Sequence, residues 1–242
     1  SLAGEDAAAS GATALAAAVA LSPDARPAAE SGFTPGGGRY GGGGASGMLL
    51  RVGSRGSRLA LTQAELAASR LRRPGVEIAL VPITTAGDRD RSRPFGEIGS
   101  RGVFVKEIEE ALLERRIDVA VHSAKDMTSS DAAGLAVGAY LAREDPRDAL
   151  CGASELRPGM RVGTASVRRR AQLLALEPSL SVEPLRGNID TRLRKRGERG
   201  LDAVVLAACG LDRLGLGGEI SRRFSTEEVL PEAGQGALAL QV

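Results

Sequence analysis

The sequence is poor in aromatic side chains, in cysteine and in long apolar runs, and each shortage excludes a class of protein. Aromatic residues make up 2% of the 242 residues and tryptophan is absent, so large aromatic anchors are scarce. The two cysteines, Cys151 and Cys209, lie far apart and lack metal-ligand spacing, which argues against a disulfide framework or a zinc site. No run approaches the roughly 18 apolar residues of a membrane-spanning helix. We therefore predict a cytoplasmic protein that binds no metal and enters no membrane.

What the sequence does contain is a globular composition with a small positive charge. Hydrophobic residues make up 43% and charged residues 26% of the chain, and the formal net charge is +2 at pH 7. This charge is too small to indicate binding driven by phosphate neutralisation, and the basic residues lack interleaved aromatics. We therefore predict no nucleic-acid partner. A small-molecule partner and a monomeric state are further expectations that the charge does not decide.

The pattern of apolar residues changes at Leu49. Residues 1–47 are Ala/Gly-rich without apolar periodicity, which predicts a disordered leader. Short apolar runs then alternate with amphipathic stretches. They predict strands at 49–54, 76–84 and 117–123 and helices at 58–73 and 103–116, with a mobile polar loop at 85–102.

A second alternating set follows residues 145–150, which resemble a connection. It predicts strands at 160–166, 181–185 and 202–208 and helices at 167–177 and 188–200. Strands that alternate with helices favour an α/β fold with mostly parallel sheets, and two such sets predict two lobes. Ligands of such folds bind beyond the carboxyl ends of strands.

One strand end carries several chemically capable side chains. The stretch "VAVHSAKDM" at 119–127 ends an apolar alternation in His122, Ser123, Lys125 and Asp126. His122 is either a hydrogen-bonded core residue or a functional one. Lys125 and Asp126 form either a surface ion pair of little energetic value or part of a cleft, where nearby cations keep the carboxylate ionised. An ionised aspartate in a cleft can stabilise a developing cation.

Three predicted strand-to-helix turns combine hydroxyl groups, amides and arginines at helix starts. They comprise Ser54, Arg55 and Ser57; Thr164, Ser166, Arg168, Arg169 and Arg170; and Arg186, Asn188 and Arg192. Helix N-termini and guanidinium groups suit carboxylates, so the pattern predicts a ligand with several negative charges, although solvated surface arginines would look the same. Phe104 is either core or a stacking surface for a planar ring. "GQGA" at 234–237 matches no nucleotide-binding glycine motif.

Eight motifs, in order and spacing, resemble the porphobilinogen deaminase (hydroxymethylbilane synthase) family over about 49–242. They are "RVGSRGSRLALTQ", "GSRGVFVKEIEEALL", "DVAVHSAKD", "REDPRDAL", "VGTASVRRRAQL", "LRGNIDTRL", "LAACGLDRLGL" and "LPEAGQGAL". The resemblance implies a transferase of porphyrin and heme biosynthesis. Such an enzyme joins four porphobilinogen units head to tail into the tetrapyrrole hydroxymethylbilane and releases ammonia each time.

The resemblance also implies roles for individual residues. Asp126 is the expected catalytic carboxylate, which would bind pyrrole N–H groups, stabilise the cationic azafulvene and help move protons. The expected contacts to the cofactor and to substrate carboxylates are Lys125, Arg55, Ser57, Arg168, Arg169, Arg186, Gly187 and Arg192. Ser123, Thr164 and Ser166 are expected to assist as neutral donors, and Phe104 to stack on a ring.

The implied architecture is a pair of lobes like those of type II periplasmic binding proteins, with mixed, mostly parallel sheets. We expect domain 1 at 48–144 plus 233–242 and domain 2 at 145–232. Family members hold a dipyrromethane cofactor through a cysteine thioether in a third domain after the GQG segment. Neither cysteine here has that context, so both are expected to be structural, domain 3 to be absent, and the chain alone not to turn over.

Three positions depart from the family pattern. Arg58 stands where proline is usual, Ala86 where a basic residue is common, and Arg101 in place of lysine. An alternative of another class is a noncatalytic two-lobe binding module for a polycarboxylate anion. Such a module would explain the arginines equally well but would not require Asp126.

Overall fold

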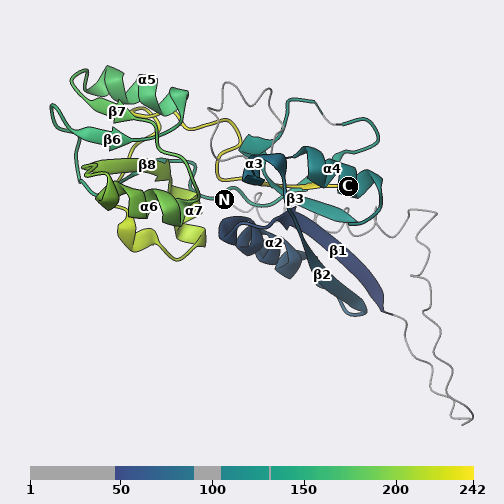
Figure 1. Ribbon diagram of the computed structural model, residues 1–242. Coiled ribbons are helices and arrows are strands. Elements are labelled where there is room, and N and C mark those ends of the chain that lie inside the picture. Colours follow the sequence, from purple (N-terminus) through teal and green to yellow (C-terminus); the bar gives the residue numbers. More distant parts are fainter. Residues whose placement is uncertain (1–46, 90–104, 131) are drawn as a thin grey trace, which may run out of the picture.

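The structure is a computed structural model that describes residues 47–89, 105–130 and 132–242 (Figure 1). The predicted leader apart from Gly47, most of the predicted loop at 85–102, and Phe104 lie outside the described residues. Two five-stranded sheets organise the described part of the chain, one in each of two lobes that lie side by side.

The first lobe is built on a sheet with the strand order β2-β1-β3-β10-β4. Its strands are β1 (Met48–Arg55), β2 (Val76–Ile83), β3 (Val119–Ser123), β4 (Val137–Tyr140) and β10 (Leu238–Gln241). β1 pairs in parallel with β2 and β3, whereas β10 is antiparallel to β3 and β4. The helical segments of this lobe are α2 (Arg58–Leu71), α3 (Ala86–Arg89), α4 (Lys106–Leu113) and the 3-10 turn η1 (Ala124–Asp126).

The second lobe repeats this plan with the strand order β7-β6-β8-β5-β9. Its strands are β5 (Asp148–Cys151), β6 (Arg161–Gly163), β7 (Ser181–Glu183), β8 (Ala203–Ala207) and β9 (Arg222–Arg223). β6 pairs in parallel with β7 and β8, and β5 is antiparallel to β8 and β9. The helical segments are α5 (Val167–Leu176), α6 (Ile189–Glu198), α7 (Ala208–Arg213) and the 3-10 turn η2 (Gly217–Glu219).

The α/β class and the two lobes with mixed sheets are confirmed, but parallel pairs do not form the expected majority. Each sheet has two parallel and two antiparallel pairings. The reason is that the fourth strand of each sheet, β5 or β10, enters directly from the other lobe and runs against both of its neighbours.

The segment predicted as a connection at 145–150 contains the start of β5, which corrects that prediction. Asp148 and Leu150 are both 0% exposed, because β8 and β9 flank the strand. The polar start and Pro146 give this strand the local appearance of a loop. Cys209, which directly follows the strand predicted at 202–208, lies in α7.

Close packing fixes the strands that lead to the cleft. In the first lobe α2 covers β1 and β3, and Val52, Ala64 and Val119 are fully buried there. Gly53 in β1 leaves no room for a side chain, because an added Cβ would lie 2.3 Å from Ile117 Cδ1. The carboxyl end of β1, and with it the start of α2, is therefore held in place.

The two lobes also touch where α2 meets α6 and α7. A Cβ added to Gly210 would lie 2.8 Å from Ile189 Cδ1 and 3.6 Å from Leu59 Cδ2. Beside this contact, Arg58 Nη1 forms an ion pair with Asp190 Oδ1 at 2.9 Å. The arginine that departs from the family pattern thus links the first lobe to the second.

Candidate functional site

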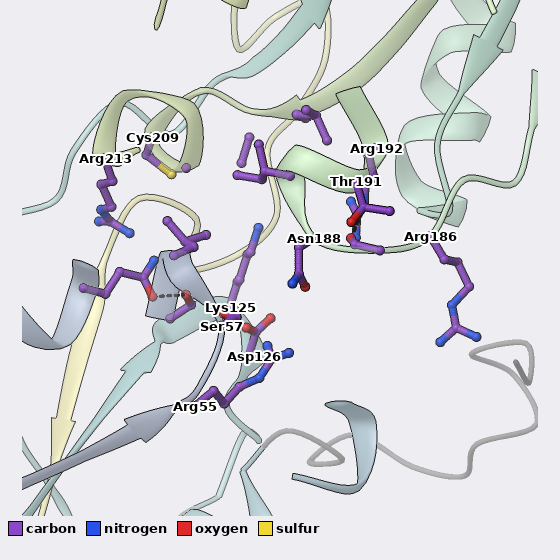
Figure 2. Close-up of a pocket in the computed structure, with 18 of the residues that line it drawn as sticks. Arg55, Ser57, Lys125, Asp126, Arg186, Asn188, Thr191, Arg192, Cys209 and Arg213 are labelled. Carbon is purple, nitrogen blue, oxygen red and sulfur yellow. Dashed lines mark hydrogen bonds between the residues drawn. The ribbon is translucent and has the colours of Figure 1, made fainter. Parts of the chain in front are cut away.

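A cavity of about 530 Å³ lies between the lobes, in the size range of small-molecule sites (Figure 2). Nine of the predicted site residues line it: Arg55, Ser57, Ser123, Lys125, Asp126, Arg169, Arg186, Gly187 and Arg192. They come from the carboxyl ends of strands and the starts of the following helices in both lobes.

The first-lobe wall is formed by the ends of β1 and β3 (Figure 2). Ser57 caps α2 by accepting a hydrogen bond from the Ala60 amide at 3.3 Å. Ser123 Oγ donates to Gln63 Oε1 at 3.3 Å. Lys125 and Asp126 follow in η1, and Figure 2 shows the Lys125 side chain extended into the space between the lobes. This wall therefore offers an ammonium and a carboxylate side by side.

His122 belongs to the sheet rather than to the main cavity. Its side chain is 4% exposed, and its Nε2 lies 3.1 Å from Gln241 Oε1. Burial lowers the pKa of His122 to about 4, although the Gln241 hydrogen bond opposes the shift. The ring is therefore neutral at pH 7, which favours the structural interpretation of the single histidine.

The second-lobe wall includes the turn before α6 and the first turn of that helix, together with residues of α5, β8 and α7 (Figure 2). Arg192 Nε donates to the Gly187 carbonyl at 2.6 Å, which ties the arginine to the turn. Gly187 has φ +123°, and an added Cβ would lie 2.8 Å from Thr191 Cγ2. Glycine is therefore required at this position for both conformation and space.

Positive charge dominates the cavity. Among the described residues that line it, eight are Lys or Arg and one, Asp126, is acidic. Burial lowers the pKa of Lys125; Asp126 opposes this shift and Arg169 adds to it. Burial and the charges of Arg169 and Arg186 lower the pKa of Arg192 to about 10, whereas the charge of Asp126 opposes this shift. Because the cations disfavour one another, an anion bound here would relieve their repulsion.

Three residues predicted as contacts lie away from this lining. Arg168 is engaged within the protein, with Asp148 Oδ2 at 2.8 Å, Glu232 Oε2 at 3.1 Å and the Leu230 carbonyl. Ser166 caps α5 by accepting from the Arg169 amide at 3.3 Å. Thr164 Oγ1 accepts from the Ser166 amide at 3.2 Å. The structure therefore gives these three side chains contacts that shape the turn before α5.

Arg169 combines a cavity position with a buried partner. It is 6% exposed, and its Nη2 donates to Asp148 Oδ1 at 2.7 Å. Burial raises the pKa of Asp148, but the charges of Arg169 and Arg168 and hydrogen bonds from Arg169 and Gln235 outweigh it, so the net shift is downward. Among the described residues, Arg169 Nε is a buried donor without an acceptor.

The family model described as "Porphobilinogen deaminase, dipyromethane cofactor binding domain" matches residues 50–242. The chain belongs to the porphobilinogen deaminase family. Porphobilinogen deaminase of Syntrophotalea carbinolica is 48% identical over 203 residues, which is 81% of this chain and 64% of that protein. The relative from Pelobacter propionicus is 48% identical over 198 residues, 79% of this chain and 64% of its own length. The chain thus spans just under two thirds of these curated relatives.

Two solved structures align with this chain at low sequence identity and with TM-scores below 0.5. A putative periplasmic sulfonate-binding protein SsuA from Methylobacillus flagellatus aligns with a TM-score of 0.46 at 12% identity and covers 81% of this chain and 62% of its own. The BenM effector binding domain with benzoate aligns with a TM-score of 0.45 at 13% identity, over 81% of this chain and 83% of its own.

The residues present fit the dipyrromethane cofactor of this family. A group with several carboxylates needs several donors in one cavity, and crowded cations with a buried Arg169 Nε lacking an acceptor meet that need. Lys125 from the first lobe and Arg186 and Arg192 from the second are among the cations that line the cavity (Figure 2).

Sequence reasoning missed several lining residues. Gln63, Thr191, Cys209 and Arg213 line the cavity although no turn motif marks them. Cys209 reaches it because α7 packs beside α2 across the lobe boundary. Both cysteines are free, and burial raises the pKa of Cys151 to about 11.

The described ranges lack two kinds of feature. They contain no helix with the length and apolar character needed to cross a membrane. They also contain no group of three or more His, Cys, Asp and Glu side chains arranged to hold a metal ion.

Proposed function

We propose that the chain forms the cleft in which four porphobilinogen units are joined head to tail to give hydroxymethylbilane, with release of ammonia at each step. One observation carries this proposal: among the described lining residues, a single carboxylate, Asp126, stands among eight cations. A substrate with several carboxylates and one reacting centre that becomes positive has the complementary charge pattern.

The cations bind and orient the substrate in this proposal. Each porphobilinogen unit carries an acetate and a propionate group, which guanidinium groups bind in two-point contacts. The proposed contacts are Arg55, Ser57, Ser123, Lys125, Arg169, Arg186, Gly187 and Arg192. Arg168, Ser166 and Thr164 are assigned to supporting the turn before α5, because their contacts in the structure lie within the protein.

Asp126 acts on the reacting centre. Its carboxylate attracts the cationic aminomethyl group, stabilises the positive charge left on the substrate ring when ammonia departs, and accepts or returns a proton at an Oδ atom. Dipyrromethane, when bound, supplies the pyrrole ring to which the first substrate unit is joined. Lys125, Arg169, Arg186 and Arg192 are the proposed residues that hold its carboxylates.

The proposal extends to the organisation and setting of the protein. We assign domain 1 to 48–144 plus 233–242 and domain 2 to 145–232, because β10 completes the first sheet. The protein is proposed to act as a cytoplasmic monomer without nucleic-acid or membrane partners. Sedimentation velocity at micromolar concentration tests the monomeric state.

Substitution of Asp126 tests the catalytic role. In protein that carries the cofactor, Asp126→Asn is expected to reduce ammonia release from porphobilinogen by about 100-fold or more, because general acid–base and electrostatic roles are worth that much. Binding of porphobilinogen, measured by calorimetry, should change only a few-fold. Asp202→Asn is the matched control, since Asp202 accepts from the Arg161 amide at 2.7 Å and is absent from the lining. Unchanged ammonia release in Asp126→Asn would contradict the proposal.

The cationic lining also supports a noncatalytic binding module for a polycarboxylate anion as a second candidate. That protein would bind porphobilinogen without releasing ammonia, and Asp126→Asn would alter affinity alone.

Intact mass and visible spectra after incubation with porphobilinogen locate the cofactor. A covalent pyrrole adduct on this chain would assign attachment to Cys151 or Cys209, and an unmodified mass would assign it to the cysteine that the family places after the GQG segment.

A further inference from the structure

The GQG segment at 234–236 forms a turn that is packed between the two lobes. Gly234 and Gly236 have φ values of +73° and +92°, which favour glycine. A Cβ added to Gly234 would lie 3.0 Å from the Lys125 amide nitrogen, and one added to Gly236 would lie 2.5 Å from the Glu144 carbonyl oxygen. The turn therefore fits tightly against η1 on one side and against the segment leading to β5 on the other.

Gln235 lies at the centre of this turn with 1% of its surface exposed. Its Oε1 accepts a hydrogen bond from Lys125 Nζ at 3.4 Å. Its Nε2 donates to the Pro146 carbonyl at 2.6 Å and to Asp148 Oδ1 at 2.8 Å. Both ends of the amide are thus used, one toward the first-lobe wall and the other toward β5.

The chain of hydrogen bonds continues into the second lobe. Asp148 is 0% exposed, and its Oδ1 also accepts from Arg169 Nη2 at 2.7 Å. Lys125 and Arg169 both line the cavity, whereas Gln235 and Asp148 are absent from its lining. A continuous series of hydrogen bonds, Lys125–Gln235–Asp148–Arg169, therefore joins a cation on one wall to a cation on the other.

An amide is the side chain that this position requires. It accepts from an ammonium and donates to a carboxylate at the same time. A carboxylate here would face Asp148 with a like charge, and an ammonium would face Lys125 with one. An apolar side chain would remove the hydrogen bond that Lys125 donates to Gln235 and one of those that Asp148 accepts.

We propose that Gln235 is a positioning residue that fixes Lys125 and, through Asp148, Arg169 in one arrangement, so that cations from both lobes bind the same carboxylate-bearing ligand. This inference rests on the proposed function for the nature of the ligand. The charged or titratable groups that act on Lys125 come from several elements: Asp126 in η1, Arg169 in α5, Cys209 in α7 and Asp148 in β5.

The test compares two buried glutamines. Gln241, in β10, is 0% exposed and also bridges two side chains, since it contacts His122 Nε2 at 3.1 Å and donates to Glu109 Oε1 at 3.0 Å. Gln235→Met and Gln241→Met each replace an amide by an unbranched side chain of similar size. Titration calorimetry with porphobilinogen should show about tenfold weaker binding for Gln235→Met, from loss of a hydrogen bond to a charged group, and a change below about twofold for Gln241→Met.

A second comparison separates positioning from a general structural role. Gln235→Met is repeated in the Lys125→Met background, where the hydrogen bond between Lys125 and Gln235 is already absent. If Gln235 acts through Lys125, its effect on the dissociation constant should fall from about tenfold to below threefold. An equal loss of affinity in both backgrounds, or equal losses for the two glutamines, would overturn the proposal.

Gln235→Glu gives a second readout that does not depend on the methionine variant. Its carboxylate would favour the charged form of Lys125, so the loss of porphobilinogen binding at high pH should move to higher pH than in the parent protein. An unmoved pH profile would refute the positioning role. If the parent protein does not bind porphobilinogen at all, the proposed function fails, whereas binding that is insensitive to both Gln235 substitutions refutes the Gln235 inference alone.

Discussion

Asp148→Asn should destabilise the protein strongly although it changes a single functional group. Asp148 is 0% exposed and accepts side-chain hydrogen bonds from Arg168 at 2.8 Å, Arg169 at 2.7 Å and Gln235 at 2.8 Å. In the variant Arg168 keeps Glu232 at 3.1 Å. Arg169, which is 6% exposed, keeps the Val205 carbonyl at 3.2 Å and loses its carboxylate. The loss of unfolding free energy in Asp148→Asn therefore comes mainly from one buried guanidinium, that of Arg169, which has lost its counter-charge.

Removal of one partner from a buried ion pair typically costs about 3–5 kcal/mol. For a chain of this size each kcal/mol lowers Tm by roughly 2–4 °C, so we expect a decrease of roughly 6–20 °C at pH 7. Urea titration followed by far-UV circular dichroism measures the free energy of unfolding, and a thermal scan measures Tm. Asp118→Asn is the matched control. Asp118 pairs with Arg51 at 2.7 Å, but the two side chains are 25% and 37% exposed, so its loss should cost at most about 1 kcal/mol.

The pH dependence gives a separate check on Asp148. A carboxyl group whose folded-state pKa is lowered stabilises the fold above its unfolded pKa of about 3.9, and this contribution is lost as the pH falls toward the folded value. The difference in unfolding free energy between parent and Asp148→Asn should therefore be full at pH 5–7 and should shrink below about pH 4. If Asp148→Asn lost no more unfolding free energy at pH 7 than Asp118→Asn, the argument from the buried ion pair would be refuted.

Three further predictions concern other parts of the molecule. Because the pKa of His122 is lowered to about 4, the folded state should lose stability as the pH falls from about 6.5 to 4, by about 3 kcal/mol at most, and His122→Gln should flatten that slope in urea titrations. Arg58→Ala removes an exposed pair whose side chains are 61% and 48% exposed, so calorimetry should show less than about fivefold weaker porphobilinogen binding, and 1 M salt should abolish the difference. Iodoacetamide should alkylate Cys209 before Cys151, because burial raises the pKa of the Cys151 thiol to about 11. Peptide mass spectrometry would show this order, and bound porphobilinogen should protect the Cys209 thiol, which lines the cavity.

The secondary structure that depends on local pattern was predictable from the sequence. The predicted strand at 117–123 and helix at 58–73 correspond to β3 and α2, because alternation and helical spacing are properties of neighbouring residues. The clustering of Lys125 with Arg186 in one cavity follows from the rule that strand ends of both lobes face the cleft.

The parts that were not predictable depend on residues distant in sequence. The residues next to Asp148 in the sequence suggest a loop. Its hydrogen bonds come from Arg169 and Gln235, which lie 21 and 87 positions away. Arg168 resembled a ligand contact for the same reason, since its partners Asp148 and Glu232 lie 20 and 64 positions away. Neighbouring residues give no sign of such pairings, so charge alone could not separate a binding arginine from a structural one.

The return of β10 to the first sheet has a consequence for the order in which the protein forms during synthesis. β10 lies between β3 and β4, so the first sheet stays in two parts until residue 241 has left the ribosome. The second sheet uses strands from residues 148–223 alone, so it can close earlier although it is made later. Until then β3 has an unpaired edge, the kind of surface that recruits foreign strands. Chaperone capture of nascent chains should therefore be strongest after β3 emerges and should end once β10 has docked.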